Sequence, residues 1–231
     1  MKKIGITGAR GFIGSHLVKK INDPIIFEFN LCCLPDVRNF VKECDRIYHI
    51  AGKNRDIGGE ILRNNLISTS NIILAMHLEK KDPELIFISS TQVEWSPISE
   101  YSVSKFLEEH AVKEAKKWCI YRVPNVYGPG CRAYYNSVVA TFCTQIAQDK
   151  ELTVKDLSVS REFIYIDDLV RSLLNPEFNK YMRPKGQALT IGEIVAYLTD
   201  GFGKHKKLQK TLEYYMEKEG IKNGIISAAQ K

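Results

Sequence analysis

A glycine-rich segment near the N-terminus constrains the fold of this chain more than any other feature. A short apolar run over residues 3–7 precedes three glycines, at positions 8, 11 and 14, and residues 15–21 carry apolar side chains at helical spacing. A strand, a tight turn and a helix in this order point free backbone N–H groups and the positive end of a helix dipole at a phosphate. The segment therefore predicts a nucleotide-binding turn.

Each glycine has a separate role in such a turn. Gly8 permits the turn itself, Gly11 lets the backbone approach a pyrophosphate, and Gly14 permits close packing of the helix on the strand. A glycine-rich turn that binds nothing is the alternative. The preceding strand and the following amphipathic helix favour the binding turn, since the motif requires that context.

The length and the cysteine content limit the class of protein. A chain of 231 residues accommodates one domain, or one domain with a small lobe. No run approaches the roughly 20 apolar residues that span a bilayer, and the N-terminus has no signal-peptide pattern. The six cysteines form no CxxC pair, which favours reduced thiols in a cytoplasmic protein. We expect no metal site and no membrane partner.

The net charge of +6 comes partly from lysines near the C-terminus, at positions 204, 206, 207 and 210. Such a cluster could contact nucleic acid. A solvated helix face is the better interpretation, because three glutamates follow in the same segment, at 213, 217 and 219. We therefore expect no nucleic-acid partner, and a modest positive charge suits an anionic nucleotide sugar.

Strand-like and helix-like segments alternate through residue 123. Further strands are predicted over 25–29, 45–52, 85–92 and 118–123, with helices over about 38–44, 59–79 and 100–117. This alternation predicts an α/β fold with a Rossmann-type, doubly wound parallel sheet. Beyond residue 123 we predict a strand over 161–168 and helices over 136–148, 169–174, 191–198 and 207–218.

We expect two domains from this pattern. Residues 1–170 form the NAD(P)-binding domain, and part of residues 124–160 contributes to the substrate site. Residues 171–231 form a small, mainly helical substrate-binding lobe that closes over the cofactor. The order of the elements places the glycine turn and the exits of the central strands at one edge of the sheet, where such folds bind ligands.

The end of the second predicted strand bears on the choice of cofactor. In dinucleotide folds an acidic residue at this strand end commonly holds the adenosine ribose. Here the strand ends in Phe29 and Asn30, with Glu28 one step inside. Arg10 lies in the glycine turn, where a guanidinium could meet a 2′-phosphate. Both points favour NADP(H) over NAD(H), although Arg10 could also be a solvated loop residue.

A tyrosine and a lysine at helical spacing are the candidate catalytic groups. Tyr101 and Lys105 lie one turn apart on a predicted helix. An ammonium close to a phenol lowers the pKa of the phenol, which makes Tyr101 a candidate acid or base. Ser90, at the end of the preceding strand, could hydrogen-bond a substrate oxygen. Simple capping of the strand end is the alternative for Ser90, and we interpret His49 as a structural histidine.

Further motifs appear in order along residues 3 to about 170: Asp36-Val37, His49-Ile50-Ala51-Gly52, Asn65, Arg122-x-Pro124-Asn125-Val126-Tyr127-Gly128-Pro129-Gly130 and Arg161-Glu162-Phe163-Ile164-Tyr165-Ile166-Asp167-Asp168. With the glycine turn, Ser89-Ser90 and the Tyr101/Lys105 pair, they resemble the extended short-chain dehydrogenase/reductases of the NAD-dependent epimerase/dehydratase family. The resemblance implies a Rossmann-type fold, and family members commonly form homodimers through the tyrosine-bearing helix and its neighbour.

Four segments are similar to a narrower group, the reductases of UDP-N-acetyl-L-fucosamine synthesis in capsule and O-antigen formation. These segments are residues 51–55, the short loop from Ser90 to Tyr101, residues 131–142 and residues 189–195. Members of that group carry a metal-binding cupin domain after the reductase domain. The printed sequence contains no such domain, so the epimerisation attributed to the cupin is not carried over.

The resemblance also implies roles for individual residues. Tyr101 would be the acid/base, Lys105 would hold the nicotinamide ribose and tune Tyr101, and Ser90 would orient the reacting oxygen, with Thr91 as the alternative. The other cofactor-binding residues would be Gly8, Arg10, Gly11, Phe12, Ile13, Gly14, Asp36, Val37, Ala51, Gly52 and Asn65. The other substrate-binding residues would be Asn125, Asn136 and Arg161, the last through the diphosphate, unless Arg161 forms a surface ion pair.

One departure from the family narrows the reaction. Sugar 4,6-dehydratases of this family commonly place an Asp-Glu pair where this chain has Thr91-Gln92, which cannot do carboxylate chemistry. We therefore expect an NADP(H)-dependent reductase of a nucleotide-linked 4-keto sugar, a UDP-6-deoxy-N-acetylhexosamine, in surface polysaccharide biosynthesis. A 4-epimerase that retains its NAD(P) is the close alternative. A non-catalytic NADP(H)-binding sensor or scaffold is the alternative of another class.

Overall fold

The chain forms two compact units in the computed structural model, which describes residues 2–55, 59–95, 99–200 and 205–221. Unit 1 consists of Met1–Pro124 and Val170–Pro184, and unit 2 consists of Asn125–Leu169 and Lys185–Lys231. The sequence-based division at residue 170 assigns the segment 125–169 differently, because that segment folds with the C-terminal helices.

Unit 1 is built on a six-stranded sheet in the order β2-β1-β3-β4-β5-β8. The strands are β1 (Ile4–Thr7), β2 (Ile25–Ile26), β3 (Arg46–His49), β4 (Glu84–Ser90), β5 (Trp118–Val123) and β8 (Lys180–Met182). Every neighbouring pair is parallel. The strand order reverses between β1 and β3, which is the switch point where such sheets bind ligands beyond the strand ends. The predicted doubly wound parallel sheet is confirmed.

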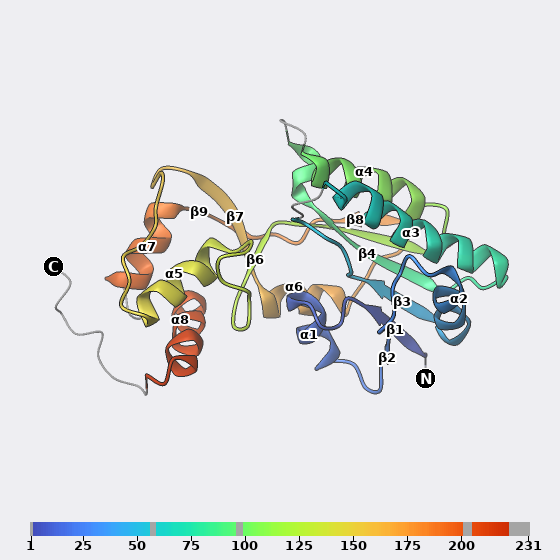
Figure 1. Ribbon diagram of the computed structural model, residues 1–231, viewed down its shortest axis with the longest axis horizontal. Coiled ribbons are helices and arrows are strands. Elements are labelled where there is room, and N and C mark those ends of the chain that lie inside the picture. The colour runs from blue at the N-terminus through green and yellow to red at the C-terminus, as the bar shows by residue number, and fades with distance from the viewer. Residues whose placement is uncertain (1, 56–58, 96–98, 201–204, 222–231) are drawn as a thin grey trace. The chain divides into compact units, whose positions relative to one another are not determined.

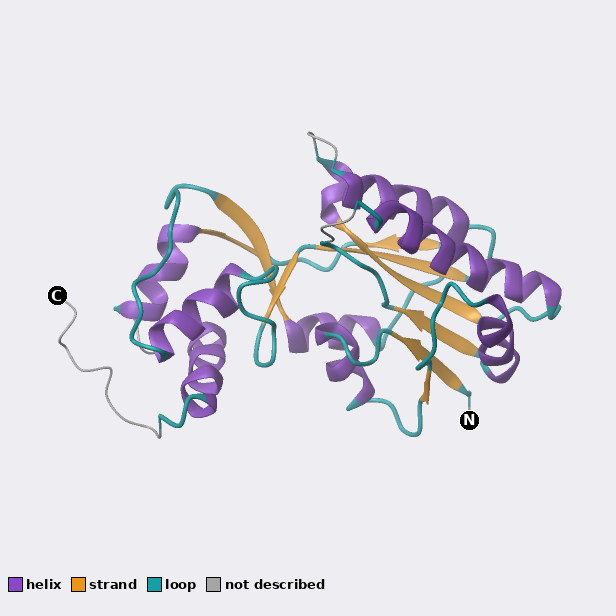
Figure 2. Cartoon of the chain, viewed as in Figure 1, coloured by secondary structure: helices purple, strands orange, loops and turns teal. Residues whose placement is uncertain are grey.

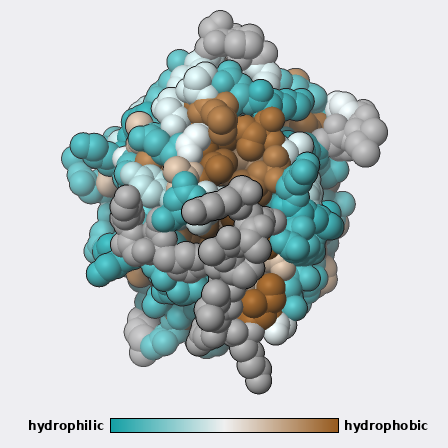
Figure 3. All heavy atoms as spheres, turned by 90° about the vertical axis from the view of Figure 1, so that its left-hand side faces the viewer, coloured by the Kyte–Doolittle hydropathy of each residue, from teal (hydrophilic) through white to brown (hydrophobic). Residues whose placement is uncertain are grey.

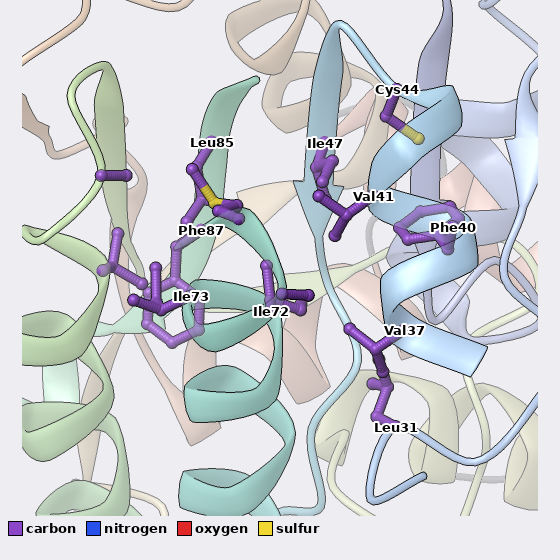
Figure 4. Close-up of a cluster of buried hydrophobic side chains, with 14 of the residues drawn as sticks. Leu31, Val37, Phe40, Val41, Cys44, Ile47, Ile72, Ile73, Leu85 and Phe87 are labelled. Atoms are coloured by element: carbon purple, nitrogen blue, oxygen red, sulfur yellow. The ribbon is translucent and has the colours of Figure 1, made fainter. Parts of the chain in front are cut away.

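Helices cover both faces of this sheet (Figure 1). α2 (Leu34–Glu43), α3 (Ile61–Leu78) and α4 (Glu100–Val112) lie side by side over one face, and α1 (Phe12–Val18) lies on the other. A 3-10 turn, η1 (Thr91–Glu94), follows β4. The main core fills the space between the sheet and the helices α2 and α3. Figure 4 shows its side chains, among them Val37, Phe40, Ile72, Leu85 and Phe87.

Unit 2 combines a small sheet with three helices (Figure 2). β6 (Asn125–Tyr127) pairs in parallel with β7 (Ser160–Tyr165), which pairs antiparallel with β9 (Gln187–Thr190). α5 (Val138–Ala147), α7 (Ile191–Thr199) and α8 (Lys206–Lys218) pack on one another. α6 (Ile166–Leu173) runs from unit 2 into unit 1. On the face seen in Figure 3, apolar residues gather in a patch among polar ones.

Three element boundaries differ from the prediction near the site. The second strand ends at Ile26, not at residue 29. α2 begins at Leu34, four residues before the predicted start, because Pro35 occupies its first turn, where proline is well tolerated. Asp36 and Val37 therefore belong to the first turn of α2. α4 ends at Val112 and does not continue to residue 117.

The second half of the chain departs further from the prediction. β7 ends at Tyr165, and Asp167 and Asp168 lie in the first turn of α6, where carboxylates favour the helix dipole. Three short strands, β6, β8 and β9, have no counterpart among the predicted elements, since three or four residues carry too little periodicity. Within the described ranges, no helix has the length and apolar character needed to cross a bilayer.

The lysines of the C-terminal cluster contact acidic residues within unit 2. Lys207 pairs with Asp168, and Lys210 Nζ lies 3.9 Å from Asp167 Oδ2. These contacts support the interpretation of the cluster as a solvated helix face. Lys204 lies outside the described residues.

Candidate active site

The glycine turn has a conformation that larger residues would not permit. Gly8 has a φ of +71°, and a Cβ there would lie 2.7 Å from the Ala51 amide nitrogen. A Cβ on Gly14 would lie 2.1 Å from the Gly8 carbonyl oxygen. The turn is closed by the Gly11 N–H, which donates to that oxygen over 2.9 Å, and α1 begins directly afterwards. This close, side-chain-free backbone fits the pyrophosphate of a dinucleotide cofactor.

A carboxylate does follow the second strand. Because β2 ends at Ile26, Glu28 lies beyond the strand, whereas the sequence-based prediction placed it one step inside the strand end. Arg10 Nη2 donates to Glu28 Oε1 over 2.7 Å, and both side chains are largely exposed. Arg10 and Glu28 therefore lie together at the place where the adenosine ribose of a bound cofactor is expected.

The two residues predicted to flank the adenine have different surroundings. The Val37 side chain is fully buried in the main core, next to Phe40 and Val41. Asp36 is half-buried in the first turn of α2. Asp36 is thus the more accessible of the two side chains.

The segment after β3 is held by Asn65 of α3. The Asn65 side chain accepts from the Lys53 N–H and donates to the Lys53 carbonyl, each over 2.8 Å, and also donates to Ser104 Oγ over 3.1 Å. This clamp places Gly52 against Lys105, since a Cβ on Gly52 would lie 3.0 Å from Lys105 Nζ. The missing side chain at Gly52 leaves room for the ammonium.

Tyr101, Lys105 and Ser90 come together as the sequence predicts. A reciprocal capping box between Ser99 and Ser102 starts α4 and fixes its first turn. Lys105 Nζ lies 6.0 Å from the centre of the Tyr101 ring and 4.5 Å from that of Phe87. Ser90, at the carboxyl end of β4, is hydrogen-bonded to Tyr101. These side chains lie beyond the strand ends, on the same edge of the sheet as the glycine turn.

Lys105 lowers the pKa of Tyr101, as the spacing predicts, but another effect opposes it. Burial raises the pKa of Tyr101 above its usual value, and this outweighs Lys105 and the Ser90 hydrogen bond, which both lower it. Glu108 also raises it. The net direction is upward, which the spacing alone does not reveal.

Thr91 and Gln92 follow Ser90 in η1. Thr91 is 3% exposed, whereas the Gln92 N–H donates to Ser90 Oγ over 3.2 Å. This contact makes Ser90 the cap of the 3-10 turn, as one of the two interpretations expected, and its role toward a substrate oxygen stays a prediction. No carboxylate follows Ser90 directly.

A second buried carboxylate on α4 supports the strands rather than Tyr101. Glu109 accepts from Ser89 Oγ over 2.6 Å, and from Arg122 Nε and Nη2 over 3.0 and 2.8 Å. Hydrogen bonding to Glu109 raises the pKa of Arg122, so the guanidinium stays charged. Glu109 links α4 to β4 and β5, and the sequence-based prediction missed it.

His49 is part of a buried hydrogen-bond chain. Its Nδ1 lies 2.8 Å from Thr7 Oγ1 and its Nε2 lies 2.9 Å from Thr69 Oγ1. Burial, followed by the charge of Lys105, lowers the pKa of His49 to about 3, so the ring is neutral at pH 7. The interpretation of His49 as a structural histidine is confirmed.

This burial predicts acid sensitivity. In the unfolded chain His49 takes up a proton below its ordinary pKa of 6.5, whereas the folded chain does so only near pH 3. The free energy of unfolding should therefore decrease as the pH is lowered from 7 to 5, by about 2 kcal/mol from this residue alone. Denaturant unfolding at both pH values measures it. His49→Gln should lose that part of the pH dependence, and an unchanged dependence in the variant would contradict the neutral assignment.

The three residues predicted to bind the sugar nucleotide all belong to unit 2. Asn125 begins β6 and donates from Nδ2 to the Glu162 carbonyl over 3.0 Å. Asn136 is exposed just before α5, and Arg161 is exposed on β7, where its Nη1 donates to the Ser160 carbonyl over 2.9 Å. The structure thus groups these residues in one unit, and the catalytic candidates in the other.

Comparison with known proteins shows which proteins the chain is similar to. It is 30% identical over 226 residues to UDP-2-acetamido-2,6-beta-L-arabino-hexul-4-ose reductase of Pseudomonas aeruginosa, over 89% of this chain and 59% of that protein. The chain thus spans less than two thirds of that relative. The structure of the capsular polysaccharide assembling protein CapF from Staphylococcus aureus is 25% identical, with a TM-score of 0.76 over 96% of this chain and 68% of that one.

A third comparison supports the fold. The structure of RMD from Pseudomonas aeruginosa, complexed with NADPH, is 21% identical, with a TM-score of 0.77 over 95% of this chain and 99% of that one. The family model described as the NAD dependent epimerase/dehydratase family matches residues 4–175. That match contains the glycine turn, Ser90, Tyr101 and Lys105, and so the chain belongs to the NAD dependent epimerase/dehydratase family.

Proposed function

We propose that this chain is a reductase that converts the 4-keto group of a nucleotide-linked sugar, a UDP-6-deoxy-N-acetylhexosamine, to an alcohol. The observation that carries the proposal is the grouping of Tyr101, Lys105 and Ser90 beyond the end of β4, with Lys105 Nζ 6.0 Å from the centre of the Tyr101 ring. A phenol that keeps its proton at neutral pH is in the form that a ketone reduction consumes. The relative from Pseudomonas aeruginosa, named as a reductase of a UDP-linked hexul-4-ose, supports the same reaction.

The chemistry divides between the cofactor and the chain. A reduced nicotinamide, when bound, supplies a hydride to the carbonyl carbon. Tyr101 gives its proton to the carbonyl oxygen, and the Ser90 hydroxyl holds that oxygen in place. Lys105 stabilises the phenolate that Tyr101 becomes. The chain has Thr91-Gln92 where sugar 4,6-dehydratases of the family commonly have an Asp-Glu pair. These two positions therefore supply no carboxylate for the removal of water, and the 4-keto sugar enters the site already formed.

A cofactor-consumption assay tests the proposal. The chain is given a UDP-linked 4-keto-6-deoxy-N-acetylhexosamine and NADPH, and both are quantified over time. We expect one NADPH to be oxidised for each sugar reduced. Sugar conversion with the cofactor returned unchanged would instead establish the 4-epimerase. Absence of turnover with tight NADPH binding would establish a sensor or scaffold.

We propose that the preferred cofactor is NADP(H). Arg10 is exposed, and among the described residues its partner is the exposed Glu28. An exposed ion pair of this kind contributes at most about 1 kcal/mol, so a doubly charged 2′-phosphate can replace the single carboxylate at little cost. Glu28 opposes the 2′-phosphate by repulsion and would accept a ribose hydroxyl of NAD(H), so the two residues act in opposite directions.

Substitution of Arg10 tests this preference. R10A should lower kcat/KM for NADPH by about 10- to 100-fold, the value of one or two charge-assisted hydrogen bonds, and change that for NADH little. E28Q should act the opposite way and improve the NADPH-to-NADH ratio. Steady-state kinetics with both cofactors measures this. An equal loss with both cofactors in R10A would contradict the proposal.

We further propose that unit 2 supplies the groups that recognise the sugar nucleotide. Arg161 suits a diphosphate because its planar guanidinium offers paired donors, and Asn125 and Asn136 offer amide groups to sugar or base. Both Arg161 and Asn136 have exposed side chains. The resemblance to the reductases supports these roles.

A homodimer is the proposed assembly. The outward faces of α3 and α4 leave four large apolar side chains substantially exposed: Leu74, Leu78, Phe106 and Leu107, at 43, 49, 48 and 38%. α3 and α4 lie side by side, so a second copy could cover both. F106E should convert the dimer to a monomer in light-scattering chromatography, and the control F29E, at a still more exposed phenylalanine (71%) outside these helices, should not. A wild-type monomer would contradict the proposal.

A further inference from the structure

Two adjacent glutamates on α4 are almost completely buried, yet they serve different partners. Glu108 is 0% exposed and Glu109 is 1% exposed. Glu109 is satisfied by Ser89 and Arg122. Glu108 faces Lys105, and its Oε2 lies 3.3 Å from Lys105 Nζ. A buried carboxylate is costly unless paired, so the position of Glu108 requires an explanation.

The other oxygen of Glu108 ends a directed hydrogen-bond chain. Thr69 Oγ1 donates its one proton to Glu108 Oε1 over 2.7 Å. The Thr69 oxygen must therefore accept the hydrogen bond that joins it to His49, with His49 Nε2 as the donor. His49 Nδ1 in turn accepts from Thr7 Oγ1, which accepts from the Ala51 N–H over 3.3 Å. Each link has one possible direction, because His49 is neutral and carries one ring proton.

This chain fixes Glu108 between a hydrogen-bond donor and an ion-pair partner. The Thr69 hydroxyl donates to Oε1, and the Lys105 ammonium lies 3.3 Å from Oε2 as an ion pair, while Oε2 accepts no hydrogen bond from the described residues. A carboxylate presents a charged oxygen to each of these two groups, whereas a glutamine is neutral and has one acceptor oxygen. Thr7 at the end of β1, His49 at the end of β3, Thr69 of α3 and Glu108 of α4 are thus linked in one series of contacts that ends at the Lys105 ammonium.

Lys105 has no other counter-ion within the part of the chain that the structure describes. Its side chain is 3% exposed, and its ammonium also lies near the rings of Phe87 and Tyr101. The titratable or charged groups around it are Tyr101 and Glu108 on its own helix and His49 on β3. Its flexible four-carbon stem can swing away once the ion pair is lost.

We propose that Glu108 is a positioning residue that holds the Lys105 ammonium beside Tyr101, through an anchor running from Thr7 by way of His49 and Thr69. The proposal rests on the proposed function, since it assigns the tuning of the same acid/base. Two effects of Glu108 on Tyr101 are opposed: the carboxylate itself raises the pKa of Tyr101, and the ammonium that it holds lowers it by a larger amount.

Because these two effects are opposed, the direction in which a substitution of Glu108 shifts the pKa of Tyr101 shows which of them dominates. If Glu108 acts through Lys105, E108Q should raise the pKa of Tyr101, by about one pH unit, because the larger contribution of the held ammonium is weakened. If Glu108 acts only by direct repulsion, E108Q should lower it. In the K105M background, where the ammonium is absent, E108Q should lower the pKa of Tyr101 under either view.

Nuclear magnetic resonance of isotope-labelled tyrosine measures the pKa of Tyr101 without substrate or cofactor, with the signal assigned by its loss in Y101F. This readout is independent of turnover, so failure of the proposed reaction would leave it intact. E109Q is the matched control, because Glu109 has no contact with Lys105, and its Tyr101 titration should match that of the wild type. If E108Q does not fold, E108D replaces it, and its shorter reach should give a smaller rise.

The proposal is supported when E108Q raises the pKa of Tyr101 in the wild-type background and lowers it in K105M. It is overturned when E108Q lowers the pKa or leaves it unchanged in the wild-type background, or when E109Q raises it equally.

Discussion

Replacing Tyr101 by phenylalanine is expected to lower kcat by about 10²- to 10⁴-fold, the usual contribution of a positioned acid or base. The substitution removes one hydroxyl and leaves the ring, which packs beside Lys105 and Ser90 in a half-buried position. The proton that the ketone oxygen needs would then come from water. Stopped-flow or steady-state measurement of NADPH oxidation with a saturating 4-keto sugar gives the effect.

The affinity for NADPH should stay within about threefold of the wild type in Y101F, because the hydroxyl is required for proton transfer rather than for holding the cofactor. Fluorescence titration of NADPH supplies this control. A kcat that is equal in Y101F and in the wild type would remove Tyr101 from the chemistry and leave the reaction without its acid.

The second large effect concerns stability. R122M should lower the free energy of unfolding by about 3 kcal/mol, because it removes the charged partner of the buried Glu109 carboxylate. Of the hydrogen-bond donors described above, only the Ser89 hydroxyl would then remain for Glu109. The loss is placed at the low end of the range for broken buried pairs, since the Arg122 side chain is itself 26% exposed. Denaturant unfolding at neutral pH measures it.

Lys116 provides the matched control for this prediction. Lys116 pairs with Asp82 on the surface, where both side chains are at least half exposed. K116M should change the free energy of unfolding by less than about 0.5 kcal/mol. Equal losses in the two variants would show that burial of Glu109 is not what makes the Arg122 pair important.

The sequence predicted the first half of the fold well because glycine turns and buried strands leave strong local signals. β5 was predicted with its observed bounds, and the parallel sheet followed from the alternation. The short strands β6, β8 and β9 could not be predicted, since their pairing depends on contacts between distant segments. The end of β2 was misplaced because residues 25–29 are apolar enough to continue a strand.

The candidate site, too, could be predicted from the sequence only in part. The pairing of Tyr101 with Lys105 follows from helical spacing, which sequence reveals. The net effect on the pKa of Tyr101 also depends on burial, which raises it and which spacing does not reveal. The anchor of Glu108 could not be foreseen either, because it joins residues from four elements through Thr69 and His49. Its one sequence trace is a glutamate three residues after Lys105.

Isotope transfer tests the central claim most directly. The chain is given a UDP-linked 4-keto-6-deoxy-N-acetylhexosamine with NADPH that carries deuterium on the transferable position of the nicotinamide. The account predicts one deuterium on the sugar carbon that bore the ketone, in an amount equal to the NADP⁺ formed, and almost none in Y101F. A converted sugar that contains no deuterium, with the NADPH returned unoxidised, would contradict the assignment of this chain as a reductase.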